Sequence, residues 1–141
     1  MEKKVMLSLR GRQKYMDQEP DVIELVTDGT MEYRNGGWEI AYEESALTGL
    51  SGVTTTFRIE PGQVILTRTG KLNSQMVFCE GVSHDSLYDM GFGAMMITVC
   101  AQRIISHIDE LGGVLDLIYT IEIEHDTAGE IDYHLDVVVK E

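Results

Sequence analysis

The residue in this chain best suited to binding chemistry is an arginine that interrupts an apolar strand pattern. From Gln63 to Gly70 the side chains alternate, which places Val64, Leu66 and Arg68 on one face of a predicted strand. A guanidinium in a protein interior costs several kcal/mol of desolvation unless an anion accompanies it. If this face lines the inside of a barrel, Arg68 therefore requires a negatively charged partner there.

The pattern leaves three interpretations of Arg68 open. The conservative one is an ion pair with Glu44, which ends an apolar row on its own strand, with Thr55 as a hydrogen-bonding neighbour. In the second, Arg68 binds a ligand carboxylate or phosphate, because the planar guanidinium matches the geometry of both groups. In the third, its long side chain reaches solvent at the rim of the barrel.

The second interpretation predicts a site for a small-molecule ligand. Arg68 would be the charge anchor, with Glu44, Thr55 and Tyr88 as polar neighbours. The apolar wall would consist of Trp38, Tyr42, Phe57, Leu66, Met76 and Phe78. Large aromatic side chains equally well fill a core, so the sequence leaves open whether the barrel is hollow or filled.

Other chemistries find little support. The histidines and cysteines lack the spacings of a metal site; they are His84, His107, His125, His134, Cys79 and Cys100. We therefore expect no metal and no cofactor, and two reduced thiols. The sequence contains no Gly-x-Ser-x-Gly elbow and no Gly-x-x-x-x-Gly-Lys loop, so nothing in it calls for an enzyme.

Charge and length restrict the partners. The net charge of −13 argues against nucleic acid or an anionic membrane as a partner, since either would require a basic surface. No apolar run approaches the roughly 20 residues of a membrane helix, and the N-terminus is too short in apolar residues for a signal peptide. A chain of 141 residues fits one domain, 1–141. We expect a cytoplasmic protein.

Alternation and turn residues predict a succession of short strands. These are expected at 4–12, 23–27, 31–33, 38–44, 53–59, 63–69 and 72–78, with a polar turn at 13–20, a bend at Asp28-Gly29 and a loop at 45–51. Asn35-Gly36-Gly37 is a strong hairpin signal, because these residues tolerate positive φ.

Two hairpin registers can be derived from parity. If Pro61-Gly62 alone forms a turn, paired residues sum to 123, which places Thr55 opposite Arg68. For the last hairpin, with a turn at Asp126–Glu130, the apolar faces match at an even sum. A sum of 256 is predicted, with Ile123 opposite Tyr133, Ile121 opposite Leu135 and Glu122 opposite His134.

The segment from Ala94 to Leu111 is ambiguous on its residues alone. Ile97, Ala101 and Ile104 recur at helical spacing, and Gly112-Gly113 would cap a helix. Alternate residues from 95 to 101 are also apolar, which favours a strand. The remaining elements give nine or ten strands, the pattern of an antiparallel barrel or sandwich. Continuous hairpins favour an up-and-down barrel, which removes exposed edges.

Several local sequences together resemble a known family. They are Trp38-Glu-Ile-Ala-Tyr-Glu-Glu44, Gly62-Gln-Val-Ile-Leu-Thr-Arg-Thr-Gly70, Met76-Val-Phe-Cys-Glu-Gly81, and Tyr88 followed by Phe92-Gly93. Their order and spacing are similar to the YwiB-like family of small bacterial proteins, calycin-like β-barrels of unknown function. Over nearly the whole chain, the resemblance implies an all-β, lipocalin-like barrel of eight to ten strands, with Ala94–Asp109 as strands. One departure is Met90-Gly91, where a Thr-Pro-like pair is expected. The family implies no catalytic residues.

Three functions remain open from the sequence. The leading hypothesis is a non-enzymatic binder that holds a small, partly apolar anion inside the barrel. The alternative is a filled barrel that recognises a protein partner or a second copy of the chain, through its acidic outer face or an unclosed strand edge. A hydrolase or isomerase that uses the barrel cavity is third.

Overall fold

The computed structural model describes residues 2–15, 19, 21–44, 51–89, 93–124 and 126–140. Its ten strands are β1 Lys3–Tyr15, β2 Asp21–Arg34, β3 Gly37–Glu43, β4 Val53–Glu60, β5 Gln63–Gly70, β6 Ser74–Phe78, β7 Ser83–Asp89, β8 Ala94–Asp109, β9 Gly112–Ile123 and β10 Asp126–Val139. No helix in the described ranges is long and apolar enough to cross a membrane. The predicted loop at 45–51 lies almost wholly outside these ranges, as does Met90-Gly91.

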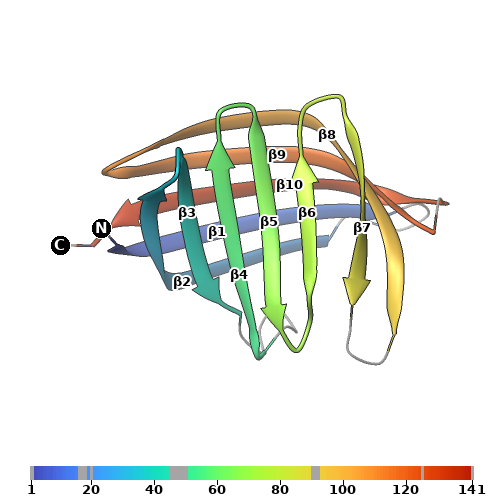
Figure 1. Ribbon diagram of the computed structural model, residues 1–141, viewed down its shortest axis with the longest axis horizontal. Coiled ribbons are helices and arrows are strands. Elements are labelled where there is room, and N and C mark those ends of the chain that lie inside the picture. The colour runs from blue at the N-terminus through green and yellow to red at the C-terminus, as the bar shows by residue number, and fades with distance from the viewer. Residues whose placement is uncertain are drawn as a thin grey trace.

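All ten strands form one antiparallel sheet that curls into a nearly closed barrel. Their order is β6-β5-β4-β3-β2-β1-β10-β9-β8-β7. The two end strands meet at an isolated bridge, where the backbone amides of Asn73 and Asp89 each donate to the other residue's carbonyl at 2.8 and 2.9 Å. In Figure 1, β3 to β7 run crosswise in front of β1, β9 and β10. The predicted up-and-down barrel is confirmed.

A glycine allows β2 to turn the corner between the front and back strands. β2 pairs with β1 from Asp21 to Met31 and with β3 from Thr30 to Arg34. Just before the β3 pairing begins, a Cβ on Gly29 would lie 2.6 Å from the Ala41 carbonyl oxygen, so only glycine permits this approach. The predicted bend at Asp28-Gly29 therefore falls where β2 gains β3 as a second partner, and the strand continues through it without a bulge.

The core lies inside the barrel and follows the alternation of the sequence. In β4 every second residue is buried, and Phe57 is 0% exposed. The other large, fully buried side chains come from strands around the barrel; they are Val5, Leu7, Met31, Ile40, Val64, Leu66, Phe78, Val99, Leu115, Leu117 and Leu135. Their burial against one another supplies the main favourable free energy of folding.

Three strand predictions are corrected or completed by the structure. β1 does not end at residue 12 but continues to Tyr15, so Gln13 belongs to a strand rather than to the predicted turn. β2 runs without a break from Asp21 to Arg34, so the interruption predicted within this strand at Asp28-Gly29 does not divide it. The ambiguous segment 94–109 is the strand β8, because β7 pairs with Ala94–Cys100 and β9 pairs with β8 from Ile97 to Asp109.

The first predicted register is confirmed and the second is wrong. β4 and β5 pair at the predicted sum, with Thr55 opposite Arg68. The last hairpin pairs Tyr133 with Leu117 and His134 with Asp116, not with Ile123 and Glu122. The chain reverses immediately after Ile123, with a bulge between Thr127 and Gly129, so the predicted five-residue turn is mostly strand. From Gly129 onward paired residues sum to 250, which is still even, and the apolar faces match.

The corrected register places His134 between two carboxylates on the outside of the barrel. Its Nδ1 lies 2.5 Å from Asp116 Oδ1, and its Nε2 lies 3.0 Å from Asp136 Oδ2. Arg10, opposite His134 on β1, lies 3.9 Å from Glu24. The hydrogen bond with Asp116 and the negative charges raise the pKa of His134, although partial burial opposes the shift.

We expect His134→Gln to destabilise the protein more in acid than in alkali. A histidine whose pKa is higher in the folded state stabilises the fold fully below its unfolded pKa of about 6.5, and this contribution is lost as the pH rises through the folded value. The melting temperatures of the two proteins should therefore differ more at about pH 6 than at about pH 9. An equal difference at both pH values would contradict this assignment.

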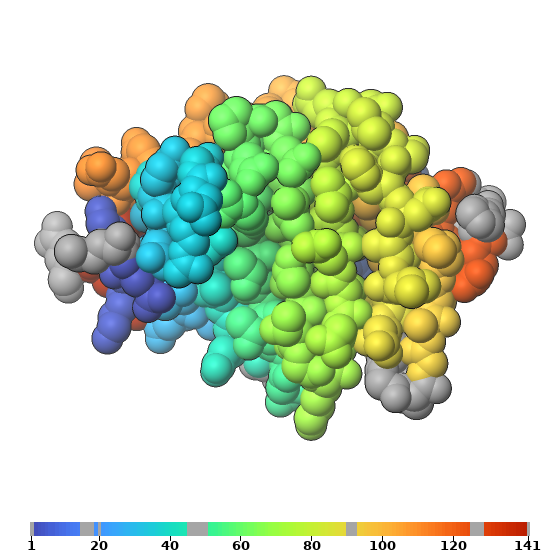
Figure 2. All heavy atoms as spheres, viewed as in Figure 1, coloured from blue at the N-terminus to red at the C-terminus, as the bar shows by residue number. Residues whose placement is uncertain are grey.

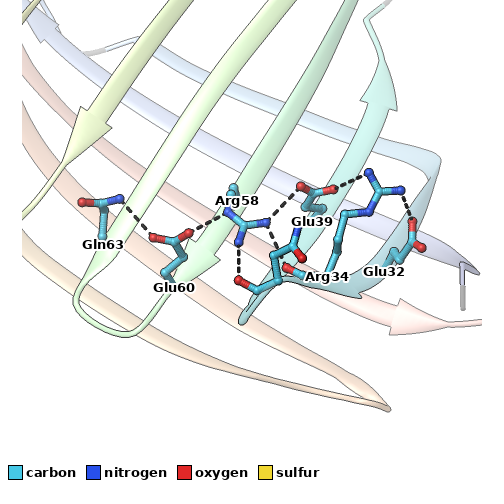
Figure 3. A network of polar contacts seen from close by, with 7 residues as sticks. Glu32, Arg34, Glu39, Arg58, Glu60 and Gln63 are labelled. Carbon is cyan, nitrogen blue, oxygen red and sulfur yellow. Dashed lines mark hydrogen bonds and ion pairs between the residues drawn. The ribbon is translucent and has the colours of Figure 1, made fainter.

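An arginine-centred network joins the turns at one end of the barrel (Figure 3). Arg58 Nε donates to Glu60 at 2.6 Å, and its terminal nitrogens donate to Glu39 and to the Arg34 and Asn35 carbonyls. These bonds join the β2–β3 turn to β4. Arg34 extends the network to Glu32, and Gln63 extends it beyond Glu60.

Candidate functional site

Arg68 lies in a row of side chains that crosses four neighbouring strands. The register pairs Tyr42 on β3 with Thr55 on β4, Thr55 with Arg68 on β5, and Arg68 with Ser74 on β6. Directly paired residues of a sheet share a face. Because Tyr42 and Thr55 are buried on the core face, the row faces the barrel interior. The predicted inward orientation of Arg68 follows from this register.

Two cavities inside the barrel meet at Arg68. The smaller, of about 110 Å³, is lined by Leu9, Gly11, Gln13, Ile23, Leu25, Tyr42, Glu44, Arg68 and Tyr133. The larger, of about 260 Å³, is lined by Gln13, Arg68, Met76, Tyr88, Met95, Ile97, Tyr119, Ile121, Ile123, Ile131 and Tyr133. Gln13, Arg68 and Tyr133 border both cavities, and Glu44 borders only the smaller one.

The carboxylate predicted to pair with the guanidinium contacts a neighbouring hydroxyl group. Glu44, which is 8% exposed, accepts a hydrogen bond from Thr55 Oγ1 at 2.6 Å. The Nε of Arg68 is buried and has no hydrogen-bond partner. A buried donor left in this state is costly, so it favours the approach of an acceptor.

Two tyrosines provide neutral hydroxyl groups beside Arg68. The Oη atoms of Tyr42 and Tyr133 lie 3.4 Å apart. Burial raises the pKa of Tyr42, and the neighbouring Tyr133 and Glu44 raise it further. Burial also raises the pKa of Tyr133, although the hydrogen bond with Tyr42 and the charge of Arg68 oppose the shift. Both phenols therefore stay protonated at neutral pH and can donate hydrogen bonds.

The structure brings together only part of the predicted ligand site. Tyr42, Glu44, Arg68, Met76 and Tyr88 line the two cavities. Thr55 is fully buried and contacts Glu44. The side chains of Phe57, Leu66 and Phe78 are buried in the core. Trp38 lies at the end of β3 beside Tyr33, at a ring-centroid distance of 4.9 Å. The three core residues form packing surface and do not line either cavity.

Gln13, Tyr119 and Tyr133 line the cavities and were absent from the predicted ligand site. Gln13 carries the same signal as Arg68, because it is a polar residue at the end of the apolar row Leu7, Leu9, Gly11 on β1. Because Gln13 was predicted to lie in the turn at 13–20, it was not counted as part of the apolar row of β1. Tyr133 packs beside Gly11, where an added Cβ would lie 3.8 Å from its ring. Nothing in the local sequence of Tyr133 indicates that it faces Arg68.

No metal site is evident in the described part of the chain. It contains no group of three or more histidine, cysteine, aspartate or glutamate side chains placed to hold an ion. Cys79 and Cys100 are free thiols, and Cys79 Sγ lies 3.4 Å from the Gln63 side-chain oxygen. The lining of the two cavities instead offers the guanidinium of Arg68, the carboxylate of Glu44, hydrogen-bonding groups of Gln13 and the tyrosines, and apolar surface.

Comparison with known proteins agrees with this fold. Residues 7–135 match the model of a family described as a domain of unknown function, DUF1934. The chain belongs to the DUF1934 family. The match extends from β1 to β10 and so includes every strand that lines the two cavities.

One relative and one solved structure extend the comparison. The chain is 26% identical over 107 residues to the uncharacterised β-barrel protein YwiB of Bacillus subtilis, which covers 76% of this chain and 74% of YwiB. The crystal structure of the ywiB protein from Bacillus subtilis superposes with a TM-score of 0.83 at 22% identity, over 96% of this chain and 92% of that one. This chain therefore has a bacterial homologue, and the two proteins share the same barrel fold.

Proposed function

We propose that this protein binds a small monocarboxylate with an apolar tail inside the barrel, without catalysing a reaction. The observation that carries the proposal is the buried Nε of Arg68, which has no hydrogen-bond partner where two cavities meet. The planar guanidinium forms strong, directional hydrogen bonds with a carboxylate. The ligand would complete the interactions of this side chain.

The neighbouring groups favour a carboxylate over a more highly charged anion. Tyr133 borders both cavities and remains a neutral donor, as does Tyr42 in the smaller one. Glu44, in the smaller cavity, repels a second negative charge. A single carboxylate matches one guanidinium and two phenol groups, whereas a phosphate dianion would carry excess charge into the interior.

The larger cavity determines the rest of the ligand. Its wall beyond Arg68 is mostly aliphatic; these residues are Met76, Met95, Ile97, Ile121, Ile123 and Ile131. At about 260 Å³, the cavity is smaller than typical drug-sized sites. A short acyl or aryl tail therefore fits this wall, and methionine side chains can adjust to its shape.

The proposal predicts a dependence of affinity on chain length. Isothermal titration of the protein with acetate, butanoate, hexanoate and octanoate should show an affinity that rises about fourfold per buried methylene, until the cavity is filled. Octan-1-ol, the matched neutral ligand, should bind at least about tenfold more weakly than octanoate, because it cannot form charge-assisted bonds with Arg68. Equal binding of the acid and the alcohol, or binding of neither, would refute the proposed function.

A further inference from the structure

The strand β8 changes partners along its length. Residues Ala94–Cys100 pair with β7 on one side, and Gly81 N donates to the Ala101 carbonyl at 2.9 Å. The ladder is irregular between Ala101 and Arg103, and from there to Asp109 β8 pairs with β9 alone. In the described ranges, no strand covers the other side of this second half of β8.

The uncovered side carries backbone hydrogen-bonding groups. Ile104 N donates to Glu80 Oε1 at 2.8 Å, which shows that its amide points away from β9. In an antiparallel ladder, alternate residues direct their amide and carbonyl groups to the same side. Ser106 and Ile108 therefore present theirs at this edge, where nothing in the described chain pairs with them. Such an edge is a template for another strand.

A cleft runs along this edge. One part, of about 510 Å³, lies between the end of β8 and the β2–β3 and β4–β5 turns. A second part, of about 480 Å³, continues toward Glu80 and shares Ser106 and His107 with the first. Figure 2 shows the end of β8, in orange, beside the β2–β3 hairpin and the β4–β5 turn. The cleft is long enough to follow several residues of β8.

The walls of the cleft offer apolar contacts on a rigid frame. Trp38 and Ile59 line one side, and Ile108, half-buried against the core, lines the other. Tyr33 is exposed and packs edge-on against Trp38. The Arg58 network holds the two turns that form this wall (Figure 3). The wall is therefore built before any partner arrives, which limits the entropy that binding costs.

The charge of the cleft defines the partner. Asp109 lines its first part and Glu80 its second; Glu60 also lines the first part, where Arg58 pairs with it at 2.6 Å. The whole chain carries a net charge of −13. A basic segment would be attracted to this region, whereas an acidic one would be repelled.

We propose that the free edge of β8 from Ile104 to Asp109 binds an extended, basic segment of a partner protein as an additional strand. Main-chain hydrogen bonds to Ser106 and Ile108 supply affinity, and alternate side chains contact Trp38 and the carboxylates. A second copy of the chain is disfavoured as the occupant, because two chains of the same large negative charge repel each other. The inference is independent of the carboxylate site at Arg68.

A synthetic peptide of alternating lysine and valine tests the proposal on the intact protein. Trp38 is the only tryptophan in the sequence, so its fluorescence reports binding in the cleft. The peptide should shift this emission and slow hydrogen exchange at the Ser106 and Ile108 amides. A glutamate–valine peptide, and a lysine–valine peptide N-methylated at alternate residues, should do neither.

Two variants separate backbone pairing from charge. Ser106→Pro removes one backbone N–H at a sheet edge, where proline is tolerated. The affinity for the lysine–valine peptide should fall about tenfold. Asp109→Asn keeps the backbone intact and removes one negative charge. The affinity for the lysine–valine peptide should fall at low salt and change less at high salt, because salt screens the charge. Both should keep the unfolding temperature of the parent protein within a few degrees.

Three results would overturn the proposal. They are equal binding of the glutamate peptide, unchanged affinity of the N-methylated peptide, and a dimer in which Ser106 and Ile108 are protected without any peptide. The last result would assign the edge to a second copy of the chain.

Discussion

Replacing Arg68 by methionine should weaken octanoate binding at least about 100-fold and raise the free energy of unfolding of the unliganded protein by about 1 kcal/mol. The affinity falls because the carboxylate loses charge-assisted bonds. Stability rises because the side chain of Arg68 is half-buried with an unpaired Nε, whereas methionine, of similar length, fills the same space without an unpaired donor. Isothermal titration and urea unfolding measure the two effects on the same samples.

Matched variants distinguish this result from a structural role of Arg68. Arg68→Lys keeps the charge but not the planar fork, so octanoate should bind between the parent and the methionine variant. Glu44→Gln removes the nearby negative charge, so octanoate should bind more tightly. If Arg68→Met instead lowers stability by several kcal/mol, the arginine stabilises the fold and the carboxylate proposal fails.

Replacing Gly113 by alanine should lower the free energy of unfolding by about 3–5 kcal/mol. Gly113 is the second residue of β9, the return strand of the β8–β9 hairpin. Its φ is 144°, and an added Cβ would lie 1.7 Å from the His107 carbonyl oxygen. Relief of this clash requires the two strands to separate. Urea unfolding followed by circular dichroism measures the loss, which is a large fraction of the stability of an ordinary domain.

Gly36→Ala is the matched control for Gly113→Ala. Gly36 also has a positive φ, of 82°, but an added Cβ meets nothing within 4 Å. Only the conformational cost remains, and stability should fall by about 1 kcal/mol. Similar losses for the two variants would mean that the close approach of His107 to Gly113 does not determine the effect.

The carboxylate site and the strand-binding cleft occupy different parts of the barrel. The cavities at Arg68 lie inside the barrel and reach only the first half of β8, at Met95 and Ile97, whereas the cleft lies between the second half of β8 and the turns that follow β2 and β4. Their described linings share no residue, and Trp38 belongs to the cleft alone. Octanoate and the lysine–valine peptide should therefore bind without competing, and each test can fail without affecting the other.

The sequence by itself determined the local pairing and the faces of the strands. Alternation placed Phe57, Leu66 and Arg68 on one face, and a two-residue turn at Pro61-Gly62 left one register that matched them. Asn35-Gly36 likewise defined the β2–β3 hairpin, where both residues adopt positive φ. These features depend on neighbours within a few residues, so propensity and parity were sufficient.

Only the tertiary structure decided which faces met across the barrel. Parity allows any even shift, so it could not distinguish the predicted partners of Tyr133 from the observed one, Leu117. The presence of Gln13 and Tyr133 beside Arg68, and the turn of Glu44 toward Thr55, follow from closure of the sheet by strands distant in sequence. Closure depends on the summed packing of the whole barrel, which no local pattern encodes.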